Sequence, residues 1–237
     1  MARLLVTPAL RLFLPARARA GMVDVDVAAD PTASLGHAVQ AAGVPLTEVG
    51  ELRLAGMPAP PGRRLAAGDE VEVLARPRPQ PLEGPPRLLL DVHLGALARR
   101  LRLLGVDAAY ANDADDPALV AQAGAEDRLL LTQDRGLLRR RALRRAAYVR
   151  GARPDEQLAD VLDRFGLPLE PYTRCTVCNG ALAPVAKGDV LDRLEPGTRR
   201  TQEEFSRCSE CARVYWRGAH AARLDARVRE HVRLRAE

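Results

Sequence analysis

The segments Cys175-Thr176-Val177-Cys178 and Cys208-Ser209-Glu210-Cys211 hold all four cysteines of the chain, arranged as two C-x-x-C pairs. Each pair fits a tight turn that points two thiolates at one ion, and two such turns complete a tetrahedral zinc site. The long interval between the pairs, residues 179–207, predicts a zinc ribbon with an inserted loop. Because four protein ligands leave no open position for a substrate, the zinc is expected to be structural. The predicted ligands are Cys175, Cys178, Cys208 and Cys211.

Disulfides and a redox-active C-x-x-C are the alternatives for these cysteines. Disulfides would need an oxidising compartment, and a redox pair does not normally occur twice in one chain. The N-terminus has an apolar run, Leu4–Leu14, that is similar to an export signal, but Pro8 and Arg11 interrupt it. No stretch approaches the roughly 18 apolar residues of a membrane span. Thiols kept for zinc in a chain without an export signal predict a cytoplasmic protein that does not enter a membrane.

The composition sets wider bounds. The 237 residues provide room for two ordinary domains and a small module. The formal net charge of +5 permits binding to nucleic acid but does not establish it. Arginine is common throughout, whereas Lys187 is the single lysine, so an arginine cluster carries less information than usual. Only 3% of the residues are aromatic, which argues against a broad base-stacking surface.

A proline-rich stretch divides the chain. Prolines at positions 77, 79, 81, 85 and 86 exclude a helix or a central strand. They predict a stiff, extended linker that holds the domain before it a limited distance from the rest. The pattern on either side, with the cysteine pairs, predicts five segments. These are a ubiquitin-like domain at 1–75, the linker at 76–86, an α/β domain at 87–168, the zinc ribbon at 169–224 and a charged tail at 225–237.

Before the linker, the order strand, strand, helix, strand, strand predicts a β-grasp, ubiquitin-like domain. Valines alternate with acids over residues 23–27, and Ser34 is placed to cap a helix that Gly43 ends. The segment 65–71 resembles the sulfur-carrier branch of this fold. Sulfur carriers need a free C-terminal Gly-Gly, but here Arg76-Pro77 continues the chain, so carrier chemistry is not expected. The predicted strands cover 2–13, 22–28, 51–54 and 70–74, and the predicted helix covers 35–42.

Between the linker and the first cysteine pair, apolar strands alternate with helices, which predicts a parallel sheet covered on both faces. The apolar strand at 87–92 ends in an acid, Asp91. The apolar strand at 128–132 precedes another acid, Asp134. The helix at 95–104 has leucines at helical spacing along one face. The expected fold class is therefore a multidomain α+β and α/β chain. The remaining expected elements are strands at 106–111 and 147–150, helices at 117–123 and 154–165, and a basic helix after Asp134.

Acids stand at the carboxyl ends of these strands, where open parallel sheets bind ligands. Asp91 and Asp134 follow the first and third strands, and Asp113, Asp115 and Asp116 follow the second. Carboxylates gathered without lysine partners suit Mg²⁺ or Mn²⁺, which would support hydrolysis of a phosphodiester. Structural uses stay open, because Asp116 fits a helix N-cap and Asp134 fits a cap of the following helix. Asp91 is the hardest to explain structurally, since it should be partly buried and then needs a partner.

The segment 87–218 resembles the Mut-seven C-terminal RNase family, in which a PIN-like nuclease domain is fused to a zinc ribbon. The resemblance rests on Leu90-Asp91, Leu94–Gly105, Leu129–Arg135, Glu156-Gln157-Leu158, the two cysteine pairs and Arg213–Gly218. Family members commonly carry a ubiquitin-like domain in front, which matches residues 1–75. The resemblance implies cleavage of RNA, with Asp91, Asp116 and Asp134 as the ligands of the catalytic metal. PIN domains usually present a fourth acid, for which the candidates are Asp113, Asp115 and Asp155.

Basic and aromatic residues are the candidates for contacts with RNA. Arginines cluster over residues 135–153, beside the expected acidic site, where they either attract phosphate or form a solvated face. Tyr215 and Trp216 either stack on a base or, as a small zinc module favours, pack in its core. For His93, which is close to Asp91, a role toward metal or phosphate stays open, although packing or hydrogen bonding is favoured. His220 is expected to pack or to lie on the surface, because the four cysteines already satisfy zinc. The substrate-binding candidates are Arg99, Arg135 and Arg139.

The sequence therefore predicts a metal-dependent ribonuclease, a hydrolase with a structural zinc and a catalytic Mg²⁺ or Mn²⁺. RNA is its expected partner, and the ubiquitin-like domain is expected to position a substrate or to bind a protein partner. The alternative is a non-catalytic RNA-binding or adaptor protein whose acids are structural and whose zinc ribbon binds RNA. A sulfur-carrier-like module is a third hypothesis, against which the missing Gly-Gly argues.

Overall fold

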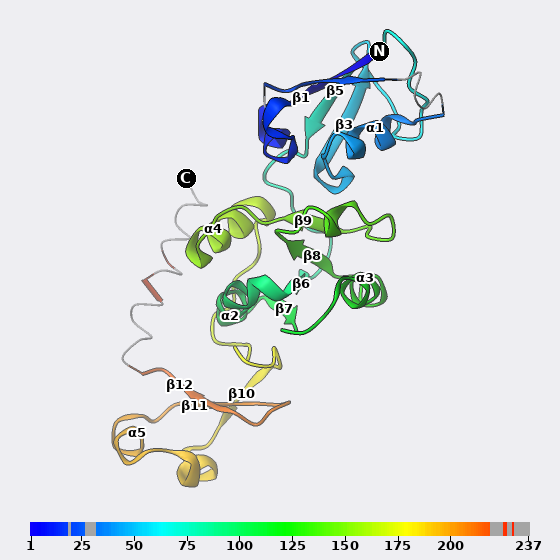
Figure 1. Ribbon diagram of the computed structural model, residues 1–237. Helices are drawn as coiled ribbons and strands as arrows, with labels where there is room; N and C mark the ends of the chain where they lie inside the picture. Colours follow the sequence, from blue (N-terminus) through cyan, green and yellow to red (C-terminus); the bar gives the residue numbers. More distant parts are fainter. Residues whose placement is uncertain (19, 27–31, 219–224, 227–228, 230–237) are drawn as a thin grey trace. The chain divides into compact units, whose positions relative to one another are not determined.

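The computed structural model describes residues 1–18, 20–26, 32–218, 225–226 and 229 (Figure 1). The chain forms two compact units. One unit combines Met1–Gln80 with Ala114–Val149, and the other combines Pro81–Asp113 with Arg150–Glu237. In the described part of the chain, no helix is both long and apolar enough to cross a membrane.

The N-terminal part of the first unit is a β-grasp domain, as the order of its elements predicts. Its elements are the strands β1 Ala2–Val6, β2 Met22–Val25, β3 Val49–Leu54, β4 Met57–Pro58 and β5 Glu70–Ala75, and the helix α1 Leu35–Ala41. The strands form one sheet in the order β2-β1-β5-β3-β4, in which β1 and β5 are parallel and the other pairs are antiparallel (Figure 1). Leu4 and Val6 of β1 are buried with Val71 and Val73 of β5, because alternate residues of a strand face the same side.

Local signals explain where these elements begin and end. The Ser34 hydroxyl accepts a hydrogen bond from the His37 amide at 3.2 Å, which confirms the predicted cap of α1. The strand predicted over residues 2–13 is too long, because Pro8 has no N–H for a sheet and starts a 3-10 helix. The strand predicted over 22–28 is β2, and residues 27–28 lie outside the described residues. The 3-10 helices of this region are η1 Pro8–Phe13, η2 Ala16–Ala18 and η3 Leu46–Glu48.

The rest of the first unit contains one helix and two parallel strands. These are α3 Asp116–Ala125, β8 Leu129–Thr132 and β9 Ala146–Tyr148, with the 3-10 helix η5 Leu137–Arg139 between the strands. β8 pairs with β9 in parallel, and all residues of β8 are buried. The basic helix predicted after Asp134 is wrong. Leu137 and Leu138 are neighbours in the sequence and both are buried, so one tight turn anchors the segment instead of a helical stripe.

The second unit begins with a parallel pair of strands and two helices. These are β6 Arg87–Leu90, α2 Gly95–Leu103, β7 Asp107–Tyr110 and α4 Pro154–Phe165, with the 3-10 helix η4 Val92–Leu94 after β6. β6 pairs with β7 in parallel, and α2 packs against both β7 and α4. Leu97, Ala98 and Leu101 of α2 are buried, which confirms its apolar face. The helix α4 has the predicted bounds. Parallel strands with helices between them confirm the α/β class of this part of the chain.

The C-terminal module is a three-stranded antiparallel sheet in the order β10-β11-β12 (Figure 1). Its strands are β10 Leu182–Val185, β11 Phe205–Cys208 and β12 Val214–Trp216. The insertion between the cysteine pairs is ordered, since it contains the 3-10 helix η6 Lys187–Arg193 and the helix α5 Pro196–Thr201. Val190 and Leu194 of the insertion form a small core with Phe205. The insertion therefore supplies the hydrophobic core that a three-stranded ribbon lacks.

Candidate functional site

The four cysteines form a compact cluster. Their sulfur atoms all lie within 4.8 Å of one another, and all four thiols are free. The contacts run between the two turns, with Cys175 Sγ 3.6 Å from Cys211 Sγ and Cys178 Sγ 3.4 Å from Cys208 Sγ. Cys175 and Cys208 are buried, whereas Cys178 and Cys211 are exposed. Four converging thiols are a donor set that zinc takes in structural sites.

The first cysteine turn is joined to the edge of β7 through Asn179. This residue has a φ of +72°, a left-handed conformation that asparagine tolerates better than most residues. Its side-chain amide donates to Asp107 Oδ1 at 2.8 Å, and its Oδ1 accepts from the Ala108 amide at 3.1 Å. Arg174 strengthens the join, because it donates to the Asn179 carbonyl at 3.0 Å and lies 3.6 Å from the Asp107 carboxylate. The turn therefore continues the hydrogen bonding of the strand.

Arg102 connects the helix α2 to the first cysteine turn. Its side chain is buried, and its guanidinium donates to the carbonyls of Ala108, Val177 and Thr176 at 2.8, 2.7 and 3.3 Å. Burial lowers the pKa of Arg102 from its ordinary value. Arg102 and Asn179 both lie within motifs of the sequence, yet nothing in their spacing indicates these long-range contacts. Their role could be found only from the tertiary structure.

Asp91 is a buried acid at the end of β6, as the sequence predicts. Its side chain is 5% exposed. It occupies the N-cap position of η4, but its carboxylate makes no capping hydrogen bond there. The backbone that follows is fixed by Tyr110, whose hydroxyl donates to the Val92 carbonyl at 3.0 Å. A Cβ at Gly95 would lie 2.6 Å from this hydroxyl, so only glycine fits beside it. The fold thus holds the Asp91 turn rigidly and does not use its carboxylate as a helix cap.

Asp116 lies at the start of α3, but it is not the cap of this helix. The cap is Asp115, whose Oδ1 accepts from the Ala118 amide at 2.9 Å, so the structural use proposed for Asp116 is wrong. The Asp116 carboxylate is half-buried and lies 3.2 Å from the Arg140 guanidinium. Because Asp115 satisfies the helix end, the Asp116 carboxylate faces a cation instead of backbone amides.

Asp134 follows β8 and closes a tight turn. Its Oδ1 accepts from the amides of Gly136 and Leu137 at 2.6 and 3.3 Å, and its own amide donates to the Thr132 hydroxyl at 2.8 Å. Asp134 therefore closes a turn through one carboxylate oxygen and is not the cap of a helix, since the 3-10 helix η5 that follows has no side-chain cap. Neither bond uses Oδ2, and the residue is exposed. The turn orients the carboxylate at the end of the strand.

The three acids belong to different units. Asp91 lies in the second unit, whereas Asp116 and Asp134 both lie in the first. Their convergence on one metal ion stays a prediction. Among the candidates for a fourth acid, Asp115 is occupied as a cap and Asp155 lies 3.1 Å from the Arg100 guanidinium. Asp113 and His93 are exposed, and His220 lies outside the described residues.

The substrate-binding candidates Arg99, Arg135 and Arg139 are all exposed. The Arg135 guanidinium lies 5.8 Å from the centre of the Phe13 ring, in the β-grasp domain. Other arginines of the 135–153 stretch are paired with acids, such as Arg145 with Asp127 at 2.7 Å. Arg135 is exposed and follows Asp134 in the chain, which fits a role in attracting phosphate. The pairing of other arginines with acids shows that part of the 135–153 stretch is a solvated face.

The chain matches two protein families. Residues 86–228, more than half of the chain, match the family described as Mut7-C RNAse domain. Residues 1–83 match the family described as Mut7-C ubiquitin. No curated protein and no solved structure matches the chain.

Proposed function

This chain belongs to the Mut7-C RNAse domain family, and we propose that it is a ribonuclease that hydrolyses RNA phosphodiester bonds with Mg²⁺ or Mn²⁺. The observation that carries the proposal is the position of Asp91, a buried carboxylate at the carboxyl end of a strand in a parallel pair, the end of such sheets where ligands bind. Asp116 and Asp134, which also stand where a strand ends or a helix begins, are the proposed companions of Asp91.

The donor set fits the proposed metal in kind. Carboxylate oxygens are the ligands that Mg²⁺ and Mn²⁺ prefer, and Asp91, Asp116 and Asp134 would hold the ion. When bound, such an ion supplies Lewis acidity that activates water and offsets the charge of the phosphodiester. The chain itself contributes rigid placement, because the turns after Asp91 and Asp134 are fixed by hydrogen bonds. Exposed Arg99, Arg135 and Arg139 would attract the phosphate backbone.

Zinc has a different role in this proposal. We place it among the four cysteines, where it holds the ribbon together without contact with substrate. The bonds from Arg102 and Asn179 to β7 then attach the zinc-bound turn to the α/β part of the same unit. The zinc would therefore stabilise the ribbon and its attachment to β7.

The proposed segments of the chain are those expected from the sequence. They are a recognition or positioning domain at 1–75, a linker at 76–86, the PIN-like nuclease domain at 87–168, the zinc ribbon at 169–224 and a tail at 225–237. We place the protein in the cytoplasm, with RNA as its substrate and a protein as a second partner of the ubiquitin-like domain.

Replacing the acids by asparagine tests the ribonuclease proposal. Asp91→Asn and Asp134→Asn keep the size of the side chain but remove the charge that binds the ion. Each should lower Mg²⁺- or Mn²⁺-dependent cleavage of RNA by about 100-fold or more, the scale of losing the group that activates a nucleophile. Asp192→Asn is the matched control, because Asp192 is an exposed acid of the ribbon insertion. Circular dichroism and zinc content check that each variant folds.

Two outcomes separate this proposal from its alternative. If wild type and both variants cleave RNA equally, the activity belongs to a contaminant or to another site. If the wild type binds RNA but cleaves none with any divalent ion, the non-catalytic adaptor hypothesis replaces the ribonuclease proposal.

A further inference from the structure

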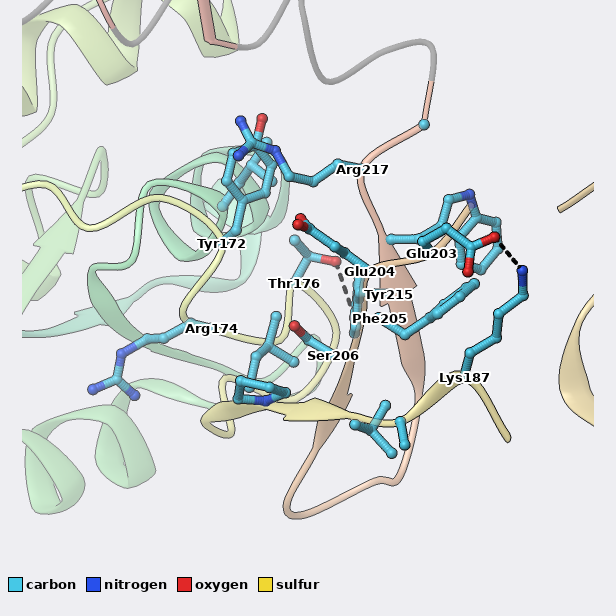
Figure 2. A pocket seen from close by; sticks show the side chains of 17 residues that line it. Tyr172, Arg174, Thr176, Lys187, Glu203, Glu204, Phe205, Ser206, Tyr215 and Arg217 are labelled. Atoms are coloured by element: carbon cyan, nitrogen blue, oxygen red, sulfur yellow. Dashed lines mark hydrogen bonds and ion pairs between the residues drawn. The ribbon is translucent and has the colours of Figure 1, made fainter. Parts of the chain in front are cut away.

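The C-terminal module carries a cavity of about 750 Å³ that the proposed catalytic site does not use (Figure 2). Its volume falls in the range of ligand pockets, and most of its described wall is apolar. The wall is built from the sheet strands β10, β11 and β12, from residues 172–176 before the sheet, and from the end of α2. All these segments belong to the second unit.

The cavity has walls on both faces of the β11–β12 pair. Phe205 stands opposite Trp216, and Ser206 stands opposite Tyr215. Successive residues of a strand point to opposite faces, so these two pairs face opposite sides of the sheet. All four residues line the same cavity, which therefore continues around the end of the strand pair. This shape suits a flexible, extended chain better than a compact small molecule.

Trp216 provides an aromatic platform on one face. The sequence favours core packing for it, yet 44% of its surface is exposed. Its ring lies 6.4 Å from the buried ring of Phe205 at an interplanar angle of 56°, which supports it from one side. An exposed aromatic ring held by a buried neighbour is a surface on which a nucleic-acid base can stack. Lys187 also lines the cavity and pairs with Glu203 at 2.6 Å (Figure 2).

Glu204 provides a hydrogen-bond acceptor on the other face. Figure 2 shows its side chain reaching toward Tyr172 and Arg217, whose guanidinium lies 4.9 Å from the centre of the Tyr172 ring. An ionised carboxylate only accepts hydrogen bonds, so it repels phosphate but can hold the amino group of a base. Guanine presents two neighbouring donors, N1–H and the 2-amino group, which match the two oxygens of a carboxylate.

We propose that this cavity binds two neighbouring nucleotides of single-stranded RNA. One base stacks on Trp216, and the other, guanine in preference to other bases, donates to the Glu204 carboxylate. Lys187 lies in the wall, where its ammonium attracts the phosphates between the bases. The inference rests on the proposed ribonuclease function for its choice of RNA, and it adds a preferred base to that function.

The stacking step is tested with full-length protein and short single-stranded RNA, without added divalent metal. Trp216 is the only tryptophan of the chain, so its fluorescence reports on this cavity alone. RNA binding should quench the emission. Trp216→Ala should weaken binding of a labelled RNA, measured by anisotropy, about 10-fold, as expected for one lost base stack. Trp216→Phe should retain most of the affinity, and the zinc content of both variants should match that of wild type.

The base-reading step is tested by replacing guanosine with inosine, which lacks only the 2-amino group. The guanosine RNA should bind wild type about 10-fold more tightly than the inosine RNA, the scale of one hydrogen bond to a charged group. Glu204→Ala, which removes both acceptor oxygens, should abolish this difference. Glu195→Ala is the matched control, because Glu195 is an exposed acid of the insertion outside the cavity.

Three results would overturn the proposal. RNA binding without quenching would place the RNA elsewhere, and equal affinity for guanosine and inosine would remove the role of Glu204. Quenching by an apolar peptide but not by RNA would assign the cavity to a protein partner. Because metal-dependent cleavage is measured separately, each of these results leaves the ribonuclease proposal intact. A wild type that binds RNA but does not cleave it would end the ribonuclease proposal and leave this RNA site intact.

Discussion

At the scale of single residues, buried polar side chains join the zinc ribbon to the strand beside it. Arg102 is 3% exposed and donates to three carbonyl oxygens. Removing its guanidinium would leave the carbonyl of buried Ala108 without this donor, at a cost of about 1–3 kcal/mol. Asn179 adds two more bonds to β7. The position of the ribbon in the second unit thus depends on side chains that bind neither metal nor substrate.

Replacing one of the proposed zinc ligands should unfold the ribbon alone. Cys208→Ser removes one of the four clustered cysteines, at the end of β11, and in small zinc modules the free energy of metal binding is largely free energy of folding. We expect wild type to contain one zinc per chain by elemental analysis and the variant to contain none. Ribbon resonances should collapse, while those of the β-grasp domain persist.

Ser209→Ala is the control for this experiment, since Ser209 is the exposed neighbour of the ligand and its hydroxyl makes only long contacts of 3.4 Å. It should retain zinc and fold. Wild-type protein purified without chelator that contains no zinc would contradict the assignment of the four cysteines.

Some of these residues have roles that their local sequence predicts, and others do not. The convergence of the four cysteines is predictable, because the geometry of a C-x-x-C turn is local. The burial of Asp91 is predictable too, because it ends an apolar strand. Arg102 and Asn179 reach partners far along the chain, and no periodicity carries that information. Nothing in the sequence indicates a role for Glu204 either, since an acid before a strand is normally a solvated side chain.

At the scale of elements, the start of α3 separates a structural acid from a proposed catalytic one. Asp115 caps the helix, and its neighbour Asp116 pairs with Arg140. Asp115→Ala should therefore lower the free energy of unfolding by about 1 kcal/mol, the usual cost of a lost N-cap, and leave cleavage of RNA nearly unchanged. Asp116→Asn should have the opposite profile, with stability within about 0.5 kcal/mol of wild type and a loss of cleavage.

Chemical denaturation and initial rates of RNA cleavage measure the two effects independently. Asp115→Ser is the rescue variant, because serine also caps helices. If Asp116→Asn cleaves RNA as fast as wild type, Asp116 is only the partner of Arg140 and is removed from the proposed site.

Elements were predicted best where a local signal marks their ends. Ser34 caps α1, and the proline at position 154 opens α4 at the predicted residue. The basic segment after Asp134 was predicted poorly, because its arginines favour a helix while its two neighbouring buried leucines require a turn. The burial of the two leucines in the tertiary structure determines the conformation of this segment, and the helix propensity of its arginines does not.

At the scale of the whole molecule, the β-grasp domain contacts the strand β9 and the turn after β8 within the first unit. The Glu48 side chain is 5% exposed, and its carboxylate accepts from the Tyr148 amide at 2.7 Å. The Phe13 and Tyr148 rings meet edge to face, with centroids 5.2 Å apart, and Arg135 lies over Phe13. Within this unit, these contacts hold the β-grasp domain against the segment that carries Arg135, the neighbour of Asp134.

This arrangement predicts that the β-grasp domain stabilises the segment that carries Arg135 and Asp134. Glu48→Ala leaves the Tyr148 amide without its acceptor, so the free energy of local opening should fall by about 1–3 kcal/mol. Hydrogen exchange of the peptide containing Tyr148 should therefore accelerate about 10-fold or more. Cleavage of RNA should fall as well, because Arg135 and Asp134 would be held less rigidly.

Two variants separate this contact from a general loss of stability. Glu48→Gln keeps an acceptor oxygen and should restore most of the protection, whereas Glu51→Ala removes an acid from β3 that pairs with Arg53 and should change nothing at Tyr148. Unchanged exchange at Tyr148 in Glu48→Ala would show that the two surfaces do not hold together in solution. The domain would then be a tethered module, and its proposed role would reduce to binding a partner. A processed fragment ending near residue 75 with a thiocarboxylate, detected by mass spectrometry, would instead restore the sulfur-carrier hypothesis.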